Sequence, residues 1–346
     1  MNTLAAVLEH TSKPLTLADI EIPALKPGQV LVEIAFSGMC HTQVLECRGD
    51  RGPDAFLPHC LGHEGSGIVR EVGAGVTKCK SGQNVMLSWM KGSGMDVPAT
   101  LYRWADRSVN SGAITTFSRF SVISENRISV LPDGFSLKDA ALIGCTVATG
   151  LGSVFNTAAA RPAQSLAVFG VGGVGLCAIA AAENLGCSPI VAVDTNPHKL
   201  KQATIMGATH TVLISNNDPV KEIQKICPPG VDVAIEASGQ TAAMKQVLQS
   251  VRGQGGNAVI VGNAREGSTL EIDPKEFNKG KRLLGSWGGD NIPDRDFPRY
   301  LDLIKRGELR LDVLTTKTYS LAQVNEALTD LEKGLIVRPL IDMHAA

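Results

Sequence analysis

The sequence predicts an α/β protein that combines a β-rich domain with a doubly wound parallel sheet, and three observations support this prediction. The chain has 346 residues, and a single hydrophobic core stops growing near roughly 250 to 300 residues, so two domains are expected. Residues 1–146 carry short apolar runs such as VLVEIAFSG, bounded by turn signals such as KPGQ, which is typical of short antiparallel strands. Residues 147–287 alternate apolar runs with helix-like stretches, which indicates a parallel sheet with helices on both faces.

The individual elements can be assigned in order along the chain. The expected strands of the parallel sheet are the apolar runs SLAVF, PIVAVD, HTVLI, VDVAIEAS and NAVIVG. The segment from residue 288 contains two helix-like stretches, DFPRYLDLIKRG and LAQVNEALTDLEKG, and ends in the strand-like PLIDM.

Charge and cysteine usage narrow the class of function. The 33 Lys and Arg residues and the 34 Asp and Glu residues give a formal net charge of −1, which provides no long-range field for nucleic acid or an anionic membrane. We therefore expect a small-molecule partner. The eight cysteines are scattered through the chain, which fits a reducing cytoplasm. The N-terminus lacks the basic start of a signal peptide.

One uncharged segment, residues 162–182, approaches the length of a membrane span. Glycines in its middle divide it into a strand-like half, SLAVF, and a helix-like half, LCAIAAA. We therefore expect a strand, a turn and a helix here, and no membrane contact.

The glycines of this turn have the pattern of a dinucleotide site. GVGGVG matches GxGxxG and consists of Gly170, Val171, Gly172, Gly173, Val174 and Gly175. Its glycines permit a tight turn and a close approach of the backbone, and the following helix would offer its N-terminal N–H groups to a pyrophosphate. The sequence therefore predicts a Rossmann domain.

The acidic residue that this motif requires is also present. A second strand, IVAV, ends at Asp194, nineteen residues beyond Gly175. A carboxylate there would bind the adenosine ribose hydroxyls and repel a 2′-phosphate, which favours NAD over NADP. Lys199 lies five residues further on, and it either reaches the same ribose or is a solvated helix residue.

Metal ligands are harder to identify from residue spacing. Cys40, His63 and Cys145 lie far apart in the sequence, and His59, Cys60 and Cys47 are rival candidates. His59 and His63 would share one face of a helix, but a proline and a glycine beside them argue against a helix there. Any single cysteine is also explained as a small buried hydrophobic residue.

The stretch GHEGSGIVREVGAGV, from Gly62 to Val76, resembles the signature of the zinc-containing medium-chain alcohol dehydrogenase family: Gly-His-Glu, a glycine three residues after the Glu, and another six further on. SGMCHTQ resembles the family's first-ligand segment, and IGCTVATGLG at 143–152 resembles its third-ligand segment. The resemblance covers essentially the whole chain. It implies a GroES-like catalytic domain from residues 1–146 and 288–346, a Rossmann NAD-binding domain from 147–287, and a homodimer or homotetramer.

Carried over by position, the resemblance implies that Cys40, His63 and Cys145 bind a catalytic zinc ion. Two thiolates and an imidazole leave a fourth position open. An alcohol bound there would ionise near about pH 7 and become able to pass a hydride to the nicotinamide. Glu64 is implied to assist ligand exchange, and Thr42 to take the alcohol proton toward the nicotinamide ribose.

Other residues have weaker implied roles. His41 and Arg338 correspond to positions near the coenzyme pyrophosphate, although His41 is alternatively a solvated loop residue. Thr149 corresponds to a position near the nicotinamide. Trp89 either forms a wall of the substrate pocket or packs in the core.

The sequence departs from the family pattern in three places. Residues 89–112, where many relatives hold a structural zinc through four cysteines, contain no cysteine, so we predict one zinc per chain and a loop held by packing or by subunit contacts. Gln43 replaces the Asp that usually orients the histidine ligand, and it raises the basicity of that ligand only weakly. Leu45 replaces a histidine at the outer end of the proton relay.

The function implied by the resemblance is hydride transfer between a primary or secondary alcohol and NAD, giving an aldehyde or a ketone. A polyol, cyclitol or hydroxymethyl-thiol dehydrogenase of the same family is an alternative, because one scaffold serves many substrates. The Cys145 segment slightly favours simple-alcohol and formaldehyde-linked members. A zinc-independent quinone or enoyl reductase would lack the ligands, and a non-catalytic NAD-binding protein would explain Gln43 and Leu45 as decayed chemistry.

Overall fold

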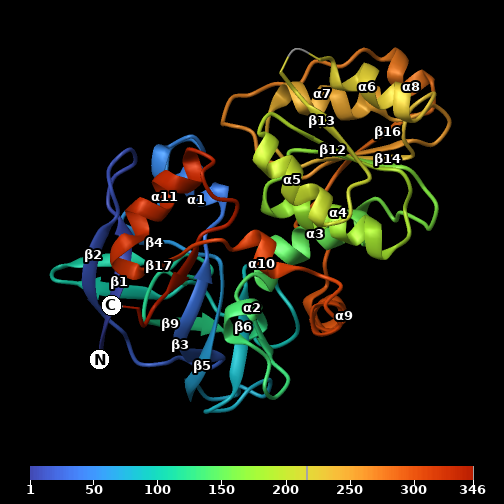
Figure 1. Cartoon of the computed structure of the whole chain (residues 1–346). Helices are drawn as coiled ribbons and strands as arrows, with labels where there is room; N and C mark the ends of the chain where they lie inside the picture. The colour runs from blue at the N-terminus through green and yellow to red at the C-terminus, as the bar shows by residue number, and fades with distance from the viewer. Residues whose placement is uncertain (216, 346) are drawn as a thin grey trace. The chain divides into compact units, whose positions relative to one another are not determined.

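The computed structural model describes residues 1–215 and 217–345, and the chain divides into two compact units (Figure 1). The first unit comprises Met1–Cys145, Ile292–Leu301 and the C-terminal segment from Thr315, and the second comprises Thr146–Asn291 and Asp302–Leu314. The sequence prediction placed Thr146, residues 288–291 and residues 302–314 in the first domain. In the structure they belong to the second unit, where Val313 and Glu308 accept hydrogen bonds from Gln202 and Asn184.

The first unit contains a closed barrel, with strand order β1-β2-β7-β8-β4, and a seven-stranded sheet, with order β10-β6-β5-β3-β18-β17 and with β9 paired to β3. The barrel strands are β1 (Asn2–Leu8), β2 (Thr16–Glu21), β4 (His59–Cys60), β7 (Leu101–Trp104) and β8 (Arg107–Asn110). The sheet strands are β3 (Gln29–Gly38), β5 (Glu64–Val72), β6 (Asn84–Ser88), β9 (Phe120–Ser124), β10 (Ile128–Val130), β17 (Thr318–Ser320) and β18 (Leu340–Asp342). Most pairings are antiparallel, as expected, whereas β4–β8 and β17–β18 are parallel.

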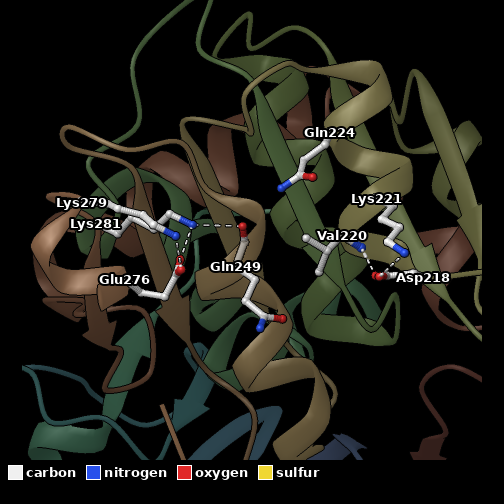
Figure 2. A pocket seen from close by; sticks show the side chains of 8 residues that line it. All are labelled: Asp218, Val220, Lys221, Gln224, Gln249, Glu276, Lys279 and Lys281. Carbon is white, nitrogen blue, oxygen red and sulfur yellow. Dashed lines mark hydrogen bonds and ion pairs between the residues drawn. The ribbon is translucent and has the colours of Figure 1, made fainter. Parts of the chain in front are cut away.

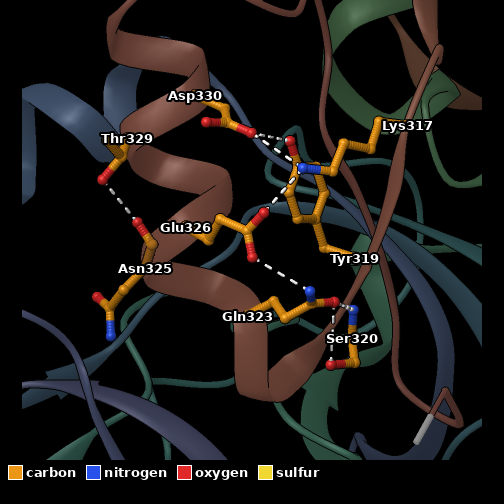
Figure 3. Close-up of polar contacts among 8 residues, drawn as sticks. All are labelled: Lys317, Tyr319, Ser320, Gln323, Asn325, Glu326, Thr329 and Asp330. Atoms are coloured by element: carbon orange, nitrogen blue, oxygen red, sulfur yellow. Dashed lines mark hydrogen bonds and ion pairs between the residues drawn. The ribbon is translucent and has the colours of Figure 1, made fainter.

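Short helices cover this unit. They are α1 (His41–Arg48), the 3₁₀ turn η1 (Glu125–Arg127), α2 (Leu137–Ala140), the 3₁₀ turn η4 (Leu321–Gln323) and α11 (Val324–Glu332), and α9 (Pro293–Lys305) begins here. α1 and α11 lie side by side in Figure 1, and Arg48 forms an ion pair with Glu332 between them. Lys317, just before β17, and Tyr319, in β17, both donate hydrogen bonds to Asp330 of α11 (Figure 3). These contacts join β17 to α11.

The second unit has the parallel sheet that the sequence predicts, with the five expected strands and a sixth, β16, in the doubly wound order β13-β12-β11-β14-β15-β16. Its strands are β11 (Leu166–Phe169), β12 (Ile190–Asp194), β13 (His210–Leu213), β14 (Val233–Glu236), β15 (Asn257–Ile260) and β16 (Arg282–Gly285). Its helices are α3 (Ala148–Gly152), the π-helical η3 (Ser153–Thr157), α4 (Gly173–Asn184), α5 (Pro197–Ile205), α6 (Pro219–Ile226), α7 (Thr241–Ser250), α8 (Lys275–Asn278) and α10 (Leu311–Leu314). In Figure 1, α4 and α5 cover one face of the sheet, and α6 and α7 cover the other.

The uncharged segment at residues 162–182 forms the strand β11, a turn and the helix α4, as predicted. A different stretch, the continuous helical segment Leu137–Thr157, has the length and composition of a membrane span. It includes the π-helical segment η2 (Ile143–Val147). Within its most apolar window 83% is buried inside the protein, as in a core helix.

Candidate active site

The first two predicted ligands stand where two strands of the first unit meet. β3 ends at Gly38 and Cys40 follows two residues later, while His63 directly precedes β5. These strands are antiparallel, with Ser37 opposite Gly65, so the end of β3 lies beside the start of β5. Strand pairing between distant segments therefore brings Cys40 and His63 together.

The third predicted ligand is positioned by the next strand. β5 pairs with β6, and the Ser88 hydroxyl at the end of β6 donates a hydrogen bond of 2.6 Å to the carbonyl of Gly144. The Leu87 carbonyl oxygen occupies the space that a Cβ on Gly144 would take, so this close backbone approach requires glycine. Cys145 follows directly, in the π-helical segment η2. Sequence reasoning did not identify Ser88, because a serine that acts through a backbone carbonyl has no motif.

The three side chains form a compact group of donors. One ligand atom from each of Cys40, His63 and Cys145 lies within 4.8 Å of the other two. Sulfur and imidazole nitrogen are the donors that zinc prefers, and three protein ligands leave one tetrahedral position for substrate. The donor set therefore fits a catalytic zinc ion.

The two sulfurs strongly influence each other. A hydrogen bond from the Cys145 thiol, helped by the charge of Arg338 and by a hydrogen bond from His63, holds the pKa of Cys40 well below its usual range. The same hydrogen bond, together with burial, raises the pKa of Cys145 well above its usual range. Cysteine binds a metal as the thiolate, so a divalent cation at this position would displace the thiol protons.

Gln43 connects the start of α1 to the histidine ligand. Its Oε1 accepts a hydrogen bond of 2.6 Å from the backbone N–H of Cys40, which is the N-cap residue of α1. Its Nε2 lies 2.5 Å from Nδ1 of His63. The amide therefore caps the helix and orients the imidazole, so that Nε2 of His63 remains for a metal.

A buried ion pair lies close to the two cysteine ligands. The Arg338 guanidinium, which is 4% exposed, contacts Oε1 of Glu64, which is fully buried. β18 brings Arg338 here because it pairs with β3, with Leu340 opposite Gly38. Burial alone would lower the pKa of Arg338, but the Glu64 carboxylate and the two nearby sulfurs raise it. A contact of Arg338 with the coenzyme pyrophosphate stays a prediction.

Other predicted site residues occupy the same region of the first unit. His41 is exposed and Thr42 is partly buried in the first turn of α1, where the Thr42 hydroxyl lies 3.6 Å from the Cys40 sulfur. Trp89 packs against the hydrophobic core with part of its surface exposed, and its carbonyl accepts a hydrogen bond from Arg127. Leu45 is buried. The functional roles of these residues stay predictions.

The rival candidates lie outside this group. His59 forms a pair with Asp54 at 2.8 Å and lies in the short strand β4, in agreement with the prediction that it is not helical. Burial raises the pKa of both the Cys47 and Cys60 thiols to about 12. Such thiols behave as buried apolar groups at neutral pH.

The glycine-rich turn of the second unit has the local structure that nucleotide binding requires. Gly170 follows β11 with φ +86°, and a Cβ there would lie 2.6 Å from the Cβ of Ser238. Helix α4 begins at Gly173, and its N-cap residue, Gly172, provides no side-chain cap. The N–H groups at the start of α4, including those of Val174 and Gly175, therefore remain available for an anionic ligand.

Asp194 ends β12 and holds the turn in place. One carboxylate oxygen accepts a hydrogen bond of 2.8 Å from the N–H of Val171, and the other accepts one of 2.8 Å from Asn196. Lys199 lies partly exposed in α5, and Thr149 is buried in α3, a helix that packs closely on α4 through Gly150. Ribose binding by Asp194 and Lys199 and nicotinamide contact by Thr149 stay predictions.

Two carboxylates hold the cysteine-free segment at residues 89–112. The Glu125 carboxylate accepts hydrogen bonds from the backbone N–H groups of Thr77, Lys78 and Met95. Asp294 accepts one from the N–H of Ser93 and forms an ion pair with Lys78. This segment was expected to be held by packing or by subunit contacts, and hydrogen bonds within the chain are an additional means.

A surface pocket of about 320 Å³ lies elsewhere, in the second unit (Figure 2). Lys281 reaches it but is only 7% exposed, and its ammonium contacts Glu276 and the carbonyls of Leu248 and Gln249. Lys279 also pairs with Glu276. Lys279 and Lys281 thus share the single carboxylate of Glu276.

The chain is similar to known proteins over its whole length. Residues 26–133 match the alcohol dehydrogenase GroES-like domain, and residues 173–306 match the zinc-binding dehydrogenase family. An S-(hydroxymethyl)glutathione dehydrogenase of Synechocystis is 31% identical over 99% of this chain and 100% of its own. An alcohol dehydrogenase zinc-binding domain protein from Burkholderia ambifaria superposes with a TM-score of 0.91 at 28% identity, covering 100% of both chains. Benzyl alcohol dehydrogenase from Acinetobacter calcoaceticus gives 0.90 at 28% identity, covering 99% of both.

The chain therefore belongs to the zinc-containing medium-chain alcohol dehydrogenase family. The predicted fold class, a GroES-like β-rich domain with a Rossmann sheet, is confirmed. The protein is an oxidoreductase, and the zinc and NAD predicted from the sequence are the cofactors of its family.

Proposed function

We propose that this enzyme oxidises a small alcohol with NAD, with zinc bound by Cys40, His63 and Cys145. The observation that carries the proposal is the approach of these three donors to within 4.8 Å of one another. When bound, zinc would polarise the substrate oxygen and allow it to lose its proton near neutral pH. The Thr42 hydroxyl, which lies 3.6 Å from the Cys40 sulfur, supports Thr42 as the group that would accept that proton.

The coenzyme preference rests on Asp194 and the turn before α4. The two carboxylate oxygens of Asp194 each accept one backbone N–H, and each retains a lone pair for a ribose hydroxyl. A 2′-phosphate would meet this negative charge, so NAD is favoured over NADP. The N-terminus of α4 would bind the pyrophosphate.

Zinc-loaded protein assayed with NAD and NADP over a panel of alcohols tests the proposal. We expect reduction of NAD with at least one primary or secondary alcohol, and loss of that activity in Cys40→Ser. Benzyl alcohol and aliphatic diols belong in the panel. Binding of zinc and NAD without turnover across the panel, in both directions, would instead identify a non-catalytic NAD-binding protein.

A second candidate substrate is the adduct of formaldehyde with a thiol. The similarity that favours it is the S-(hydroxymethyl)glutathione dehydrogenase of Synechocystis, which matches the chain from end to end. Adding formaldehyde together with glutathione to the same assay distinguishes the two. Turnover that requires both compounds supports the adduct, whereas turnover of simple alcohols alone supports the first proposal.

Assembly and location form a further part of the proposal. β16 is an edge strand of the parallel sheet, and edge strands offer backbone groups to a second chain. We expect a homodimer or a homotetramer, which light scattering would measure. The eight free cysteines support a reducing cytoplasm as its location.

A further inference from the structure

The hydrogen bonds of Gln43 have a polarity that conflicts with zinc binding. The backbone N–H of Cys40 is a donor only, so the atom that faces it at 2.6 Å must be the amide oxygen, Oε1. The amide NH₂ group then faces Nδ1 of His63, at 2.5 Å. In this arrangement Nδ1 accepts a hydrogen bond and carries no proton.

A zinc-bound His63 would need the opposite arrangement. Because Nδ1 faces Gln43, the metal would take Nε2, and a neutral imidazole that binds a metal through Nε2 carries its proton on Nδ1. That N–H would point at the NH₂ group of Gln43. Two donors would then meet at hydrogen-bond distance without an acceptor between them.

Rotation of the amide does not remove the conflict. Turning Oε1 toward His63 would satisfy its N–H, but it would place the NH₂ group against the N–H of Cys40 and remove the cap from α1. Gln43 is only 1% exposed, so water cannot readily supply the missing acceptor. A carboxylate in the same position would accept from both donors at once.

We propose that Gln43 is a positioning residue that weakens zinc binding, because its single amide oxygen cannot serve both the Cys40 N–H and a zinc-bound His63. The inference rests on the proposed zinc site. It predicts that zinc binding competes with the hydrogen bond that caps α1. Gln43 would thereby lower the affinity of the chain for zinc.

The test is a comparison of zinc affinity among Gln43 variants, measured by competition with a chromogenic chelator. Gln43→Glu keeps the length and shape of the side chain and replaces NH₂ by oxygen. We expect it to bind zinc about 10 to 100 times more tightly, the usual effect of a correct outer hydrogen bond to a histidine ligand. Gln43→Met removes the conflicting donor but also the oxygen that accepts from Cys40, so the two effects oppose each other and zinc affinity should stay within about 5-fold of the natural chain.

One control variant and one further readout separate hydrogen bonding from charge. Glu46→Gln removes one charge from α1 at a position that pairs with Arg51, and it should change zinc affinity by less than about 5-fold. Nitrogen NMR of the His63 ring, with the side-chain amide of Gln43, gives a second readout. On zinc loading Nδ1 should gain a proton, and the Gln43 amide signal should shift.

Several outcomes would overturn the inference. A loss of 10-fold or more in Gln43→Met would make the amide a productive partner of zinc-bound His63. No tightening in Gln43→Glu, an equal effect from the Glu46 charge, or an unmoved amide signal would also refute it, while leaving the proposed function intact. If no variant binds zinc, both proposals fail.

Discussion

Glu125→Gln is expected to loosen the segment that lacks the structural zinc cysteines. Glu125 is 1% exposed, and one of its oxygens accepts hydrogen bonds of 2.6 and 2.7 Å from the N–H groups of Thr77 and Lys78. The other accepts one of 2.8 Å from Met95. In the glutamine variant the amide oxygen can keep the first two, but the NH₂ group would face the N–H of Met95.

The expected magnitude follows from these contacts. A buried N–H left without an acceptor costs about 1 to 3 kcal/mol. The hydrogen bonds from Thr77 and Lys78 also become weaker, because a neutral amide oxygen replaces a charged carboxylate oxygen as their acceptor. We therefore expect a loss of about 3 kcal/mol in the free energy of unfolding of the first unit. For a domain of this size that corresponds to a fall in Tm of about 6 to 12 °C.

Calorimetry and limited trypsin digestion measure this effect. The variant should melt earlier and should be cleaved faster at Lys91, which lies in the held segment. Glu71→Gln, at an exposed position in β5, is the matched control and should change neither measurement. A loss below about 1 kcal/mol in Glu125→Gln would refute the argument, because a single surface hydrogen bond would account for it.

The same carboxylate makes the stability of this segment depend on pH. Burial alone would raise the pKa of Glu125, but hydrogen bonds from the N–H groups of Met95, Thr77 and Lys78 outweigh it and lower the pKa. A group with a depressed folded pKa stabilises the protein above its unfolded pKa, near about 4.3, and this contribution is lost as the pH falls through the folded pKa. The difference in the free energy of unfolding between the natural chain and Glu125→Gln should therefore become smaller as the pH falls.

Three further predictions concern the ligands and the nucleotide turn. Cys145→Ser should remove bound zinc, measured by metal analysis, whereas the natural chain should hold one ion; a second ion that remains in the variant would contradict the prediction of a single zinc. Asp194→Asn should reduce the preference for NAD over NADP in kcat/KM by removing the negative charge, and an unchanged ratio would assign the preference elsewhere. Gly170→Ala should weaken NAD binding, measured by calorimetric titration, and cost about 1 to 3 kcal/mol of stability, because φ is +86° and Ser238 occupies the space that the new Cβ would need. An unchanged NAD affinity would contradict this prediction.

Sequence patterns predicted the parallel sheet better than the barrel. β11, β12 and β14 are fully buried, so their apolar runs are continuous and stand out. β16 was missed because its residues are partly or fully exposed. The hairpin β7–β8, which lies in a segment expected to be a loop, was missed because Tyr102 and Val109 are its only buried residues.

The site was predictable only as far as its motifs extend. Cys40, His63 and Cys145 were found through segments that resemble a family, whereas the contacts that position them depend on strand register. Ser88 reaches Gly144 because β6 pairs with β5 in one register. A shift by one residue would turn each side chain to the opposite face of the sheet. No local pattern encodes that contact.

Strand register also explains why the role of Glu64 cannot be assigned from activity loss alone. Pairing of β3 with both β5 and β18 places Glu64 against Arg338, and both side chains are buried. Removing one partner of such a pair costs about 3 to 5 kcal/mol, because the other charge is left buried without compensation. Any Glu64 variant therefore disturbs the sheet that carries two of the ligands, whether or not the carboxylate assists ligand exchange. A Glu64 variant that changes the rate of zinc dissociation but keeps the Tm of the natural chain would assign the exchange role, because the structural role lowers the Tm as well.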